Sequence, residues 1–106
     1  MSVIQMNQDQ FNNMVVNGTD AVLVEFWAPW CVYCRRIAPA YEKIAEQYGQ
    51  ELIVAKVNID EAPDVALREQ IEVIPTLVLY RGGEAQGFVV APESKAKIEE
   101  FIAEHK

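Results

Sequence analysis

The sequence predicts an α/β fold: a mixed central β-sheet in the order βαβαβαββα, flanked by helices on both faces. Three stretches, residues 21–28, 52–59 and 76–80, are rich in β-branched and aromatic residues and have the length of buried strands. Segments with helical spacing lie between them, which makes the early connections crossovers between parallel strands. The Gly-Gly pair at 82–83 indicates a hairpin and adds an antiparallel pair of strands. No repeat, low-complexity tract or linker divides the chain, so we expect one domain over residues 1–106.

Short-range signals predict the first elements. Residues 3–6 are a short strand candidate, and Asn7 or Asp9 can cap a helix that ends at about Val16. Residues 21–28 read AVLVEFWA, a nearly continuous apolar run that predicts a strand buried on both faces.

A long amphipathic helix begins at about Cys34 and ends at Gly49. Apolar residues recur along it at the spacing of one helical face, which predicts that this face packs on the sheet. These residues are Ile37, Ala38, Tyr41, Ile44, Ala45 and Tyr48.

The second half of the chain begins with another buried strand, residues 52–59, which Lys56 interrupts. Pro63 suits the first turn of a short helix over residues 64–69.

A hairpin and a helix complete the fold. Residues 76–80 are a strong strand candidate, and a turn at 81–84 leads into a strand over 86–90. Ser94 can cap a final amphipathic helix. The apolar residues of that helix are Ile98, Phe101 and Ile102.

The charge of the chain bears on its partners and its location. Nine basic residues stand against 16 acidic ones, a net charge of −7, which disfavours nucleic acid or an anionic membrane as a partner. Residues 1–10 lack the basic and apolar regions of a signal peptide, and the longest apolar runs are too short to span a bilayer. We therefore expect a soluble, cytoplasmic protein, and a monomer by default.

Only two cysteines occur, and two residues separate them. In a reducing cytosol a lone Cys-x-x-Cys indicates catalytic redox chemistry or part of a metal site. Cys31 lies just past a buried strand and Cys34 opens the long helix, where unpaired N–H groups and the helix dipole stabilise a thiolate. Cys31 can then attack a substrate disulfide, and Cys34 can resolve the mixed disulfide.

A metal site is the alternative interpretation of the two cysteines. Zinc needs roughly four ligands, and the one histidine, His105, lies at the far end of the chain in a helix tail that we expect to be frayed. We assign His105 no role. A cluster shared between two chains, or a non-catalytic binding module, stays open on these grounds.

Several motifs together resemble those of the thioredoxin family. Residues 27–34, WAPWCVYC, resemble its active-site segment, and Ile-Pro-Thr at 74–76 resembles its cis-proline loop. Residues 56–60 are similar to its third strand, Pro39 to its helix-kinking proline, and 82–84 to the turn between its last two strands. The resemblance covers essentially the whole chain.

The resemblance implies a thioredoxin fold and reversible dithiol–disulfide exchange with no bound cofactor, because the electrons reside in a redox-active disulfide between Cys31 and Cys34. It also implies that Glu25, which stands where thioredoxins usually have a buried Asp, handles the proton of the resolving cysteine. A carboxylate inside an apolar strand is desolvated, which raises its pKa and suits a proton acceptor. Lys56 matches the family's partner for that carboxylate.

The resemblance further implies an apolar surface around the nucleophile that binds protein disulfide substrates and a thioredoxin reductase, as in electron transport and cell redox homeostasis. The residues of this surface are Trp30, Val32, Tyr33, Ile74, Pro75, Val90 and Ala91. If Pro75 is cis, the preceding carbonyl faces the groove and can pair with an extended substrate strand.

The sequence departs from the family pattern at three places. Val32-Tyr33 replaces the usual Gly-Pro between the cysteines, Glu25 is one methylene longer than Asp, and Ala91-Pro92 stands where Gly-Ala is common. Because the intervening dipeptide influences the relative stability of dithiol and disulfide, we predict a less reducing couple than that of an ordinary thioredoxin. Tyr33 is also what many glutaredoxins have, so glutathione-linked disulfide exchange is the second candidate function.

Overall fold

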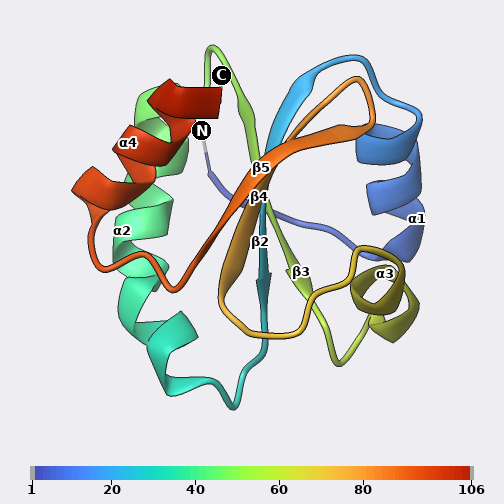
Figure 1. Ribbon diagram of the computed structural model, residues 1–106, viewed down its shortest axis with the longest axis horizontal. Coiled ribbons are helices and arrows are strands. Elements are labelled where there is room, and N and C mark those ends of the chain that lie inside the picture. The colour runs from blue at the N-terminus through green and yellow to red at the C-terminus, as the bar shows by residue number, and fades with distance from the viewer. Residues whose placement is uncertain (1, 106) are drawn as a thin grey trace.

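Five strands form one sheet at the centre of the structure, a computed structural model that describes residues 2–105, and helices cover both faces of the sheet (Figure 1). In chain order the elements are β1 (Ile4–Gln5), α1 (Gln8–Phe11), the π-helical η1 (Asn12–Val16), β2 (Ala21–Trp27), α2 (Val32–Tyr48), β3 (Ile53–Asn58), α3 (Pro63–Arg68), β4 (Thr76–Arg81), β5 (Glu84–Val90) and α4 (Lys95–His105). With α1 and η1 counted as one helix, the expected order βαβαβαββα is confirmed.

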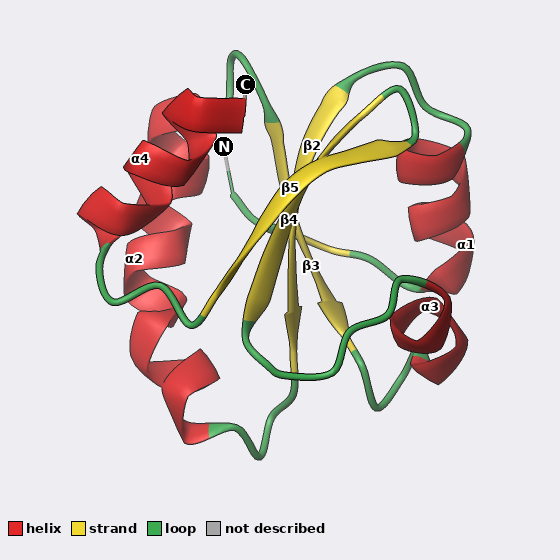
Figure 2. Ribbon diagram, in the orientation of Figure 1, coloured by secondary structure: helices red, strands yellow, loops and turns green. Residues whose placement is uncertain are grey.

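The strands lie in the order β1-β3-β2-β4-β5. β1, β3 and β2 run parallel, whereas β4 is antiparallel to β2 and β5 is antiparallel to β4. α2 and α4 lie on one side of the sheet, and α1 and α3 lie on the other (Figure 2). The fold class predicted from the sequence, a mixed sheet between two helical layers, is therefore confirmed. No helix in the described part of the chain is long and apolar enough to cross a bilayer.

Side-chain alternation along β2 divides the interior into two cores. Val22, Val24 and Phe26 belong to the cluster on the α1–α3 side, because successive side chains of a strand point to opposite faces. Leu23 belongs to the cluster under α2 and α4. Glu25 is two residues after Leu23 on β2, so its side chain points to the same face of the sheet, beneath α2.

Local capping accounts for several element boundaries. Asn7 caps α1: its side chain accepts a hydrogen bond from the Gln10 N–H at 2.8 Å, and the Gln10 side chain accepts from the Asn7 N–H at 2.9 Å. Ser94 Oγ accepts from the Lys97 N–H at 3.3 Å at the start of α4, as expected for an N-cap. β5 begins at Glu84, two residues before the predicted start, because Gly82 and Gly83 with their positive φ angles make the turn alone.

Two expectations about helix ends are wrong. α2 begins at Val32 and not near Cys34, because Cys31 is its N-cap. His105 was expected in a frayed tail, yet α4 extends to it. Its ring packs 4.7 Å from the Phe101 ring and occupies the space that a side chain at position 87 would fill, and only glycine leaves that space free.

Candidate redox site

Cys31 and Cys34 form a disulfide at the first turn of α2, with their Cα atoms 5.2 Å apart. Cys31 has extended backbone angles, as an N-cap residue does, and its Sγ accepts the Cys34 N–H at 3.2 Å. Both side chains are buried, and Cys31 is the more exposed, 8% against 3%. The N–H groups of the first helical turn and the helix dipole favour a negative charge on a sulfur in this position.

The loop before β4 approaches the disulfide from the side. The Ile74–Pro75 peptide bond is cis, and the Ile74 carbonyl oxygen lies 4.0 Å from Cys31 Sγ. The loop reaches this position because β2 and β4 are antiparallel neighbours, with Phe26 opposite Thr76. The Thr76 hydroxyl donates a hydrogen bond to the Val73 carbonyl and closes the loop.

The segment after β5 is attached to this loop. The Ala91 N–H donates to the Pro75 carbonyl oxygen at 2.8 Å. Ala91 has φ of +46°, in the left-handed region where a Cβ is disfavoured. Because this region favours glycine, Ala91 holds the loop contact at some conformational cost.

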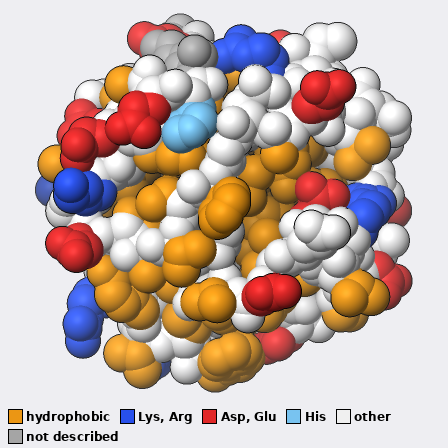
Figure 3. Space-filling model, in the orientation of Figure 1, with side chains coloured by type: hydrophobic (Ala, Val, Ile, Leu, Met, Phe, Trp, Pro, Cys, Tyr) orange, Lys and Arg blue, Asp and Glu red, His pale blue; other side chains and the backbone are white. Residues whose placement is uncertain are grey.

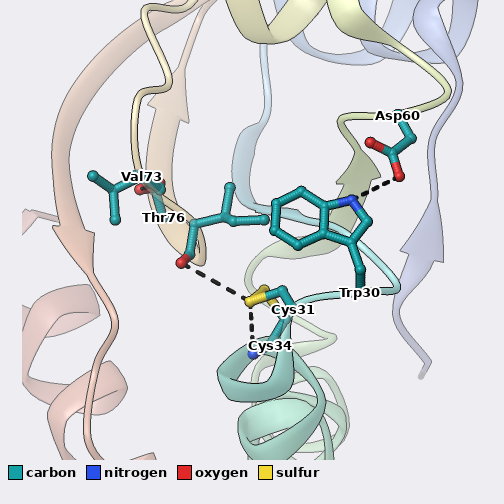
Figure 4. The surroundings of a disulfide bond; sticks show 7 residues. Trp30, Cys31, Cys34, Asp60, Val73 and Thr76 are labelled. Carbon is teal, nitrogen blue, oxygen red and sulfur yellow. Dashed lines mark hydrogen bonds between the residues drawn. A yellow bond between two sulfur atoms is a disulfide. The ribbon is translucent and has the colours of Figure 1, made fainter.

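Trp30 is the largest exposed side chain beside the disulfide, with 64% of its surface accessible. Its Nε1 donates to Asp60 Oδ2 at 3.0 Å. Figure 4 shows Trp30 and the 73–76 segment on opposite sides of the Cys31 sulfur. Asp60 is positioned by the turn after β3, where its N–H donates to Asn58 Oδ1 at 2.9 Å. Sequence reasoning gave Asp60 no role, although an acidic residue directly after a buried strand was a signal that could have found it.

The two residues between the cysteines differ in their surroundings. Val32 is exposed, whereas Tyr33 is half-buried and its hydroxyl donates to the Pro92 carbonyl oxygen at 3.3 Å. Arg36 lies 5.9 Å from the Tyr33 ring centre. Tyr33 therefore links α2 to the segment after β5, and Val32 presents an apolar side chain to solvent.

Glu25 lies on β2 directly opposite Lys56 on β3, and only 3% of its surface is accessible. Burial raises the pKa of Glu25 to about 7, although the Lys56 charge lowers it and Glu42 raises it further. Lys56 Nζ lies 4.6 Å from the Trp27 ring centre, and residues 2–105 contain no ion pair between Lys56 and Glu25. Within the described chain, neither Glu25 Oε2 nor the buried Trp27 Nε1 has a hydrogen-bond partner.

The structure brings most of the predicted site residues around one disulfide. Trp27, Tyr33 and Ile74 pack against the small buried cluster that Ala28, Cys31 and Cys34 form. Trp30 and Val32 adjoin Cys31 in the chain. Pro75 lies in the loop before β4, and a hydrogen bond joins it to Ala91. Val90, at the end of β5, is opposite Thr76. Glu25 and Lys56 are on the sheet beneath α2. Residues 2–105 hold no group of three or more His, Cys, Asp or Glu side chains placed to bind a metal.

Comparisons with known proteins agree with this geometry. The family model for thioredoxin matches residues 2–104. Thioredoxin 1 of Nostoc sp. is 40% identical over 101 residues, which cover 95% of this chain and 94% of the relative. The thioredoxin of Acidithiobacillus ferridurans is also 40% identical with the same coverage. The M-type chloroplastic thioredoxin of Chlamydomonas reinhardtii is 39% identical over 94% of this chain and 71% of its own length.

Proposed function

This chain belongs to the thioredoxin family of protein disulfide oxidoreductases, and on that premise we propose that it reduces protein disulfides with Cys31 as the nucleophile and Cys34 as the resolving thiol. The observation that carries the assignment is the position of Cys31. It caps α2, it is the more exposed sulfur, and it faces the Ile74 carbonyl. Cys34 lies three residues further along α2, is the more buried sulfur and is bonded to Cys31.

The reaction transfers two electrons in two exchanges. The Cys31 thiolate attacks one sulfur of the substrate disulfide, forms a mixed disulfide and releases the first substrate thiolate. Cys34, as the thiolate, then attacks Cys31 Sγ. This step forms the Cys31–Cys34 disulfide and releases the second substrate sulfur as a thiolate, which takes up a proton from water. A thioredoxin reductase returns two electrons and restores the dithiol, so no bound cofactor is needed.

Glu25 is the proposed acceptor of the Cys34 proton. Its pKa near 7 allows it to exchange a proton at neutral pH, and its Oε2 has no protein partner in residues 2–105 that would compete for the proton. Lys56 opposes the effect of burial and keeps the pKa within this range. Both are positioning or proton-handling residues on the sheet, and neither is placed to touch the substrate.

The substrate surface surrounds Cys31. We assign to it Trp30, Val32, Ile74, Pro75, Val90 and Ala91, with Tyr33 contributing through the segment that it holds. The Ile74 carbonyl faces the sulfur and can accept a hydrogen bond from an extended substrate backbone.

The setting is proposed from the sequence: a single domain over residues 1–106 that acts as a cytoplasmic monomer in electron transport and cell redox homeostasis. One relative is a chloroplastic thioredoxin, and cell fractionation tests the cytoplasmic location proposed for this chain. Sedimentation tests the monomer.

The experiment that tests the function is reduction of insulin disulfides, with dithiothreitol as the electron source. We expect turnover by the wild-type chain and none by Cys31→Ser, because that variant lacks the attacking sulfur. Cys34→Ser, its matched control, should accumulate a covalent adduct at Cys31 that mass spectrometry detects. An adduct at Cys34 in the Cys31→Ser variant would reverse the assignment. Replacement of dithiothreitol by a thioredoxin reductase with NADPH tests the electron donor, and faster reduction by glutathione would favour glutathione-linked exchange.

A further inference from the structure

Exposed apolar side chains gather on one surface of the protein. Among residues 2–105 the large exposed hydrophobic side chains are Val16, Trp30, Val32, Leu67, Val73, Phe88 and Val90. Trp30 and Val32 flank the disulfide, and all the others except Val16 line one groove. Figure 3 shows hydrophobic side chains along the middle of this face, between β5 and α3, and on toward the lower edge where β2 leads into α2. Exposed apolar residues that form one patch mark an interaction site more often than scattered ones do.

The groove has a volume of about 900 Å³ and lies between the 66–73 segment and the hairpin of β4 and β5. Its floor is the sheet face on which Val78 stands opposite Phe88. Leu67 and Val73 form the opposite wall. Leu67 is 79% exposed and Phe88 is 67% exposed. The groove exists because β4 and β5 extend the sheet beyond the part that α3 covers.

The groove is continuous with the redox site. Thr76 and Val90, which are opposite each other on β4 and β5, line its end nearest the disulfide. Val73 directly precedes Ile74, whose carbonyl faces Cys31 Sγ. A polypeptide whose disulfide is at Cys31 can therefore extend along the groove without leaving the surface of the protein.

The charges around the groove are acidic. Glu69 and Glu72 line it, and no Lys or Arg is among its lining residues. Arg68, the adjacent cation, is already engaged: it pairs with Glu69 at 3.3 Å and donates to Asn12 at 3.0 Å. Glu69 is engaged in turn, because it pairs with Arg68 and accepts from the Tyr80 hydroxyl at 2.7 Å. Glu72, which has no ion pair among residues 2–105, is therefore the carboxylate that the groove offers beside its apolar walls.

We propose that this groove binds the segment of the substrate protein that flanks its disulfide, and that it selects segments with a large apolar side chain next to Lys or Arg. The proposal rests on the proposed function and adds the substrate class. Apolar burial against Phe88 and Leu67 supplies affinity, and the Glu72 carboxylate supplies the preference for basic residues. β5 is an edge strand, so its outer backbone groups can also pair with an extended segment.

The test compares peptides that share one Cys–Cys disulfide. One peptide carries Leu and Lys on both flanks, the second carries Ser and Glu there, and 2-hydroxyethyl disulfide serves as a substrate with no flanks. We expect Phe88→Ser and Leu67→Ser each to raise KM for the Leu–Lys peptide roughly tenfold, with 2-hydroxyethyl disulfide reduced at the wild-type rate. Val16→Ser, which removes an exposed apolar side chain outside the groove, is the matched control. It should change neither KM for the Leu–Lys peptide nor the rate of 2-hydroxyethyl disulfide reduction. Glu72→Lys should raise KM for the Leu–Lys peptide and lower it for the Ser–Glu peptide.

Different failures identify different errors. Equal KM values for the two peptides, or wild-type KM in both groove variants, would overturn the groove proposal while reduction of the short disulfide leaves the proposed function standing. A groove variant that also fails to reduce 2-hydroxyethyl disulfide would show that the residue supports the redox site. This too would overturn the proposal. Failure of the wild-type chain on all three disulfides would overturn the proposed function itself. Dimers that Phe88→Ser dissociates in sedimentation would assign the groove to a second copy of the chain instead.

Discussion

The buried Glu25 carboxyl predicts a specific dependence of stability on pH. Its pKa is about 7 in the folded protein and 4.5 when the group is unperturbed. Below pH 4.5 the group is protonated in both states and folding is not penalised. Between pH 4.5 and about 7 the unfolded chain releases this proton while the folded protein keeps it, so stability falls across this range by up to about 3 kcal/mol. Above pH 7 the folded protein holds a desolvated charge and the loss is complete.

Glu25→Gln isolates this effect, because glutamine is close in shape to the protonated carboxyl and does not titrate. We expect the variant and the wild type to have similar free energies of unfolding near pH 4.5. At pH 8.5 the variant should be the more stable, by about 3 kcal/mol at most, because its buried amide carries no charge. The gain is an upper limit, since the amide donor that replaces one oxygen also needs a partner.

The assay is urea unfolding of the oxidised proteins at pH 4.5, 6, 7 and 8.5, with the disulfide intact throughout. Other carboxyl groups titrate equally in both proteins and cancel in the difference. Glu46→Gln removes an exposed carboxyl from α2 that does not act on Glu25. It serves as the control, with an expected pH-dependent difference below about 0.5 kcal/mol. A difference between Glu25→Gln and wild type that does not change with pH would refute a raised pKa at Glu25.

Three further changes have expected outcomes. Ala91→Gly should stabilise the protein by about 0.5 kcal/mol in urea unfolding, because relief of the left-handed Ala91 backbone outweighs the extra freedom of glycine in the unfolded chain; a loss of stability would contradict this. Replacement of Val32-Tyr33 by Gly-Pro should lower the reduction potential by roughly 30 mV in equilibrium with a glutathione buffer, which corresponds to about 1.4 kcal/mol. An unchanged or higher potential would remove the reason to expect a less reducing couple. Lys56→Met should move the pH profile of mixed-disulfide resolution to higher pH, because Lys56 lowers the Glu25 pKa; rapid-mixing kinetics would show no such shift if Glu25 plays no part.

The sequence predicted the fold because its signals are local. Continuous apolar runs identified β2, β3 and β4, and the Gly82–Gly83 pair identified the hairpin. The start of α2 was placed too late because a cysteine sulfur that accepts a backbone N–H is not a usual capping signal. The end of α4 was misjudged because the His105 ring packs over Gly87 on β5, where the missing side chain leaves room for it. This contact joins residues far apart in the chain.

Only those residues of the candidate site that belong to a recognisable sequence motif could be predicted. Cys31, Cys34 and the 74–75 loop lie in motifs, and the geometry places them together. The position of Lys56 over Trp27 depends on a side-chain conformation that no spacing encodes. The groove was missed because it joins α3 to β5, segments about twenty residues apart that contribute single apolar side chains with no common pattern.

The segment after β5 has a consequence for which sequences the site tolerates. It is tied to the cis-proline loop through the N–H of residue 91 and to α2 through the carbonyl of residue 92. Both ties use main-chain atoms, so side chains at these two positions can change while the site keeps its shape. Proline lacks an N–H but keeps its carbonyl, and it is therefore acceptable at 92 and excluded at 91. The Ala-Pro pair of this protein obeys that asymmetry, and the reversed order, Pro-Ala, would detach one wall of the site.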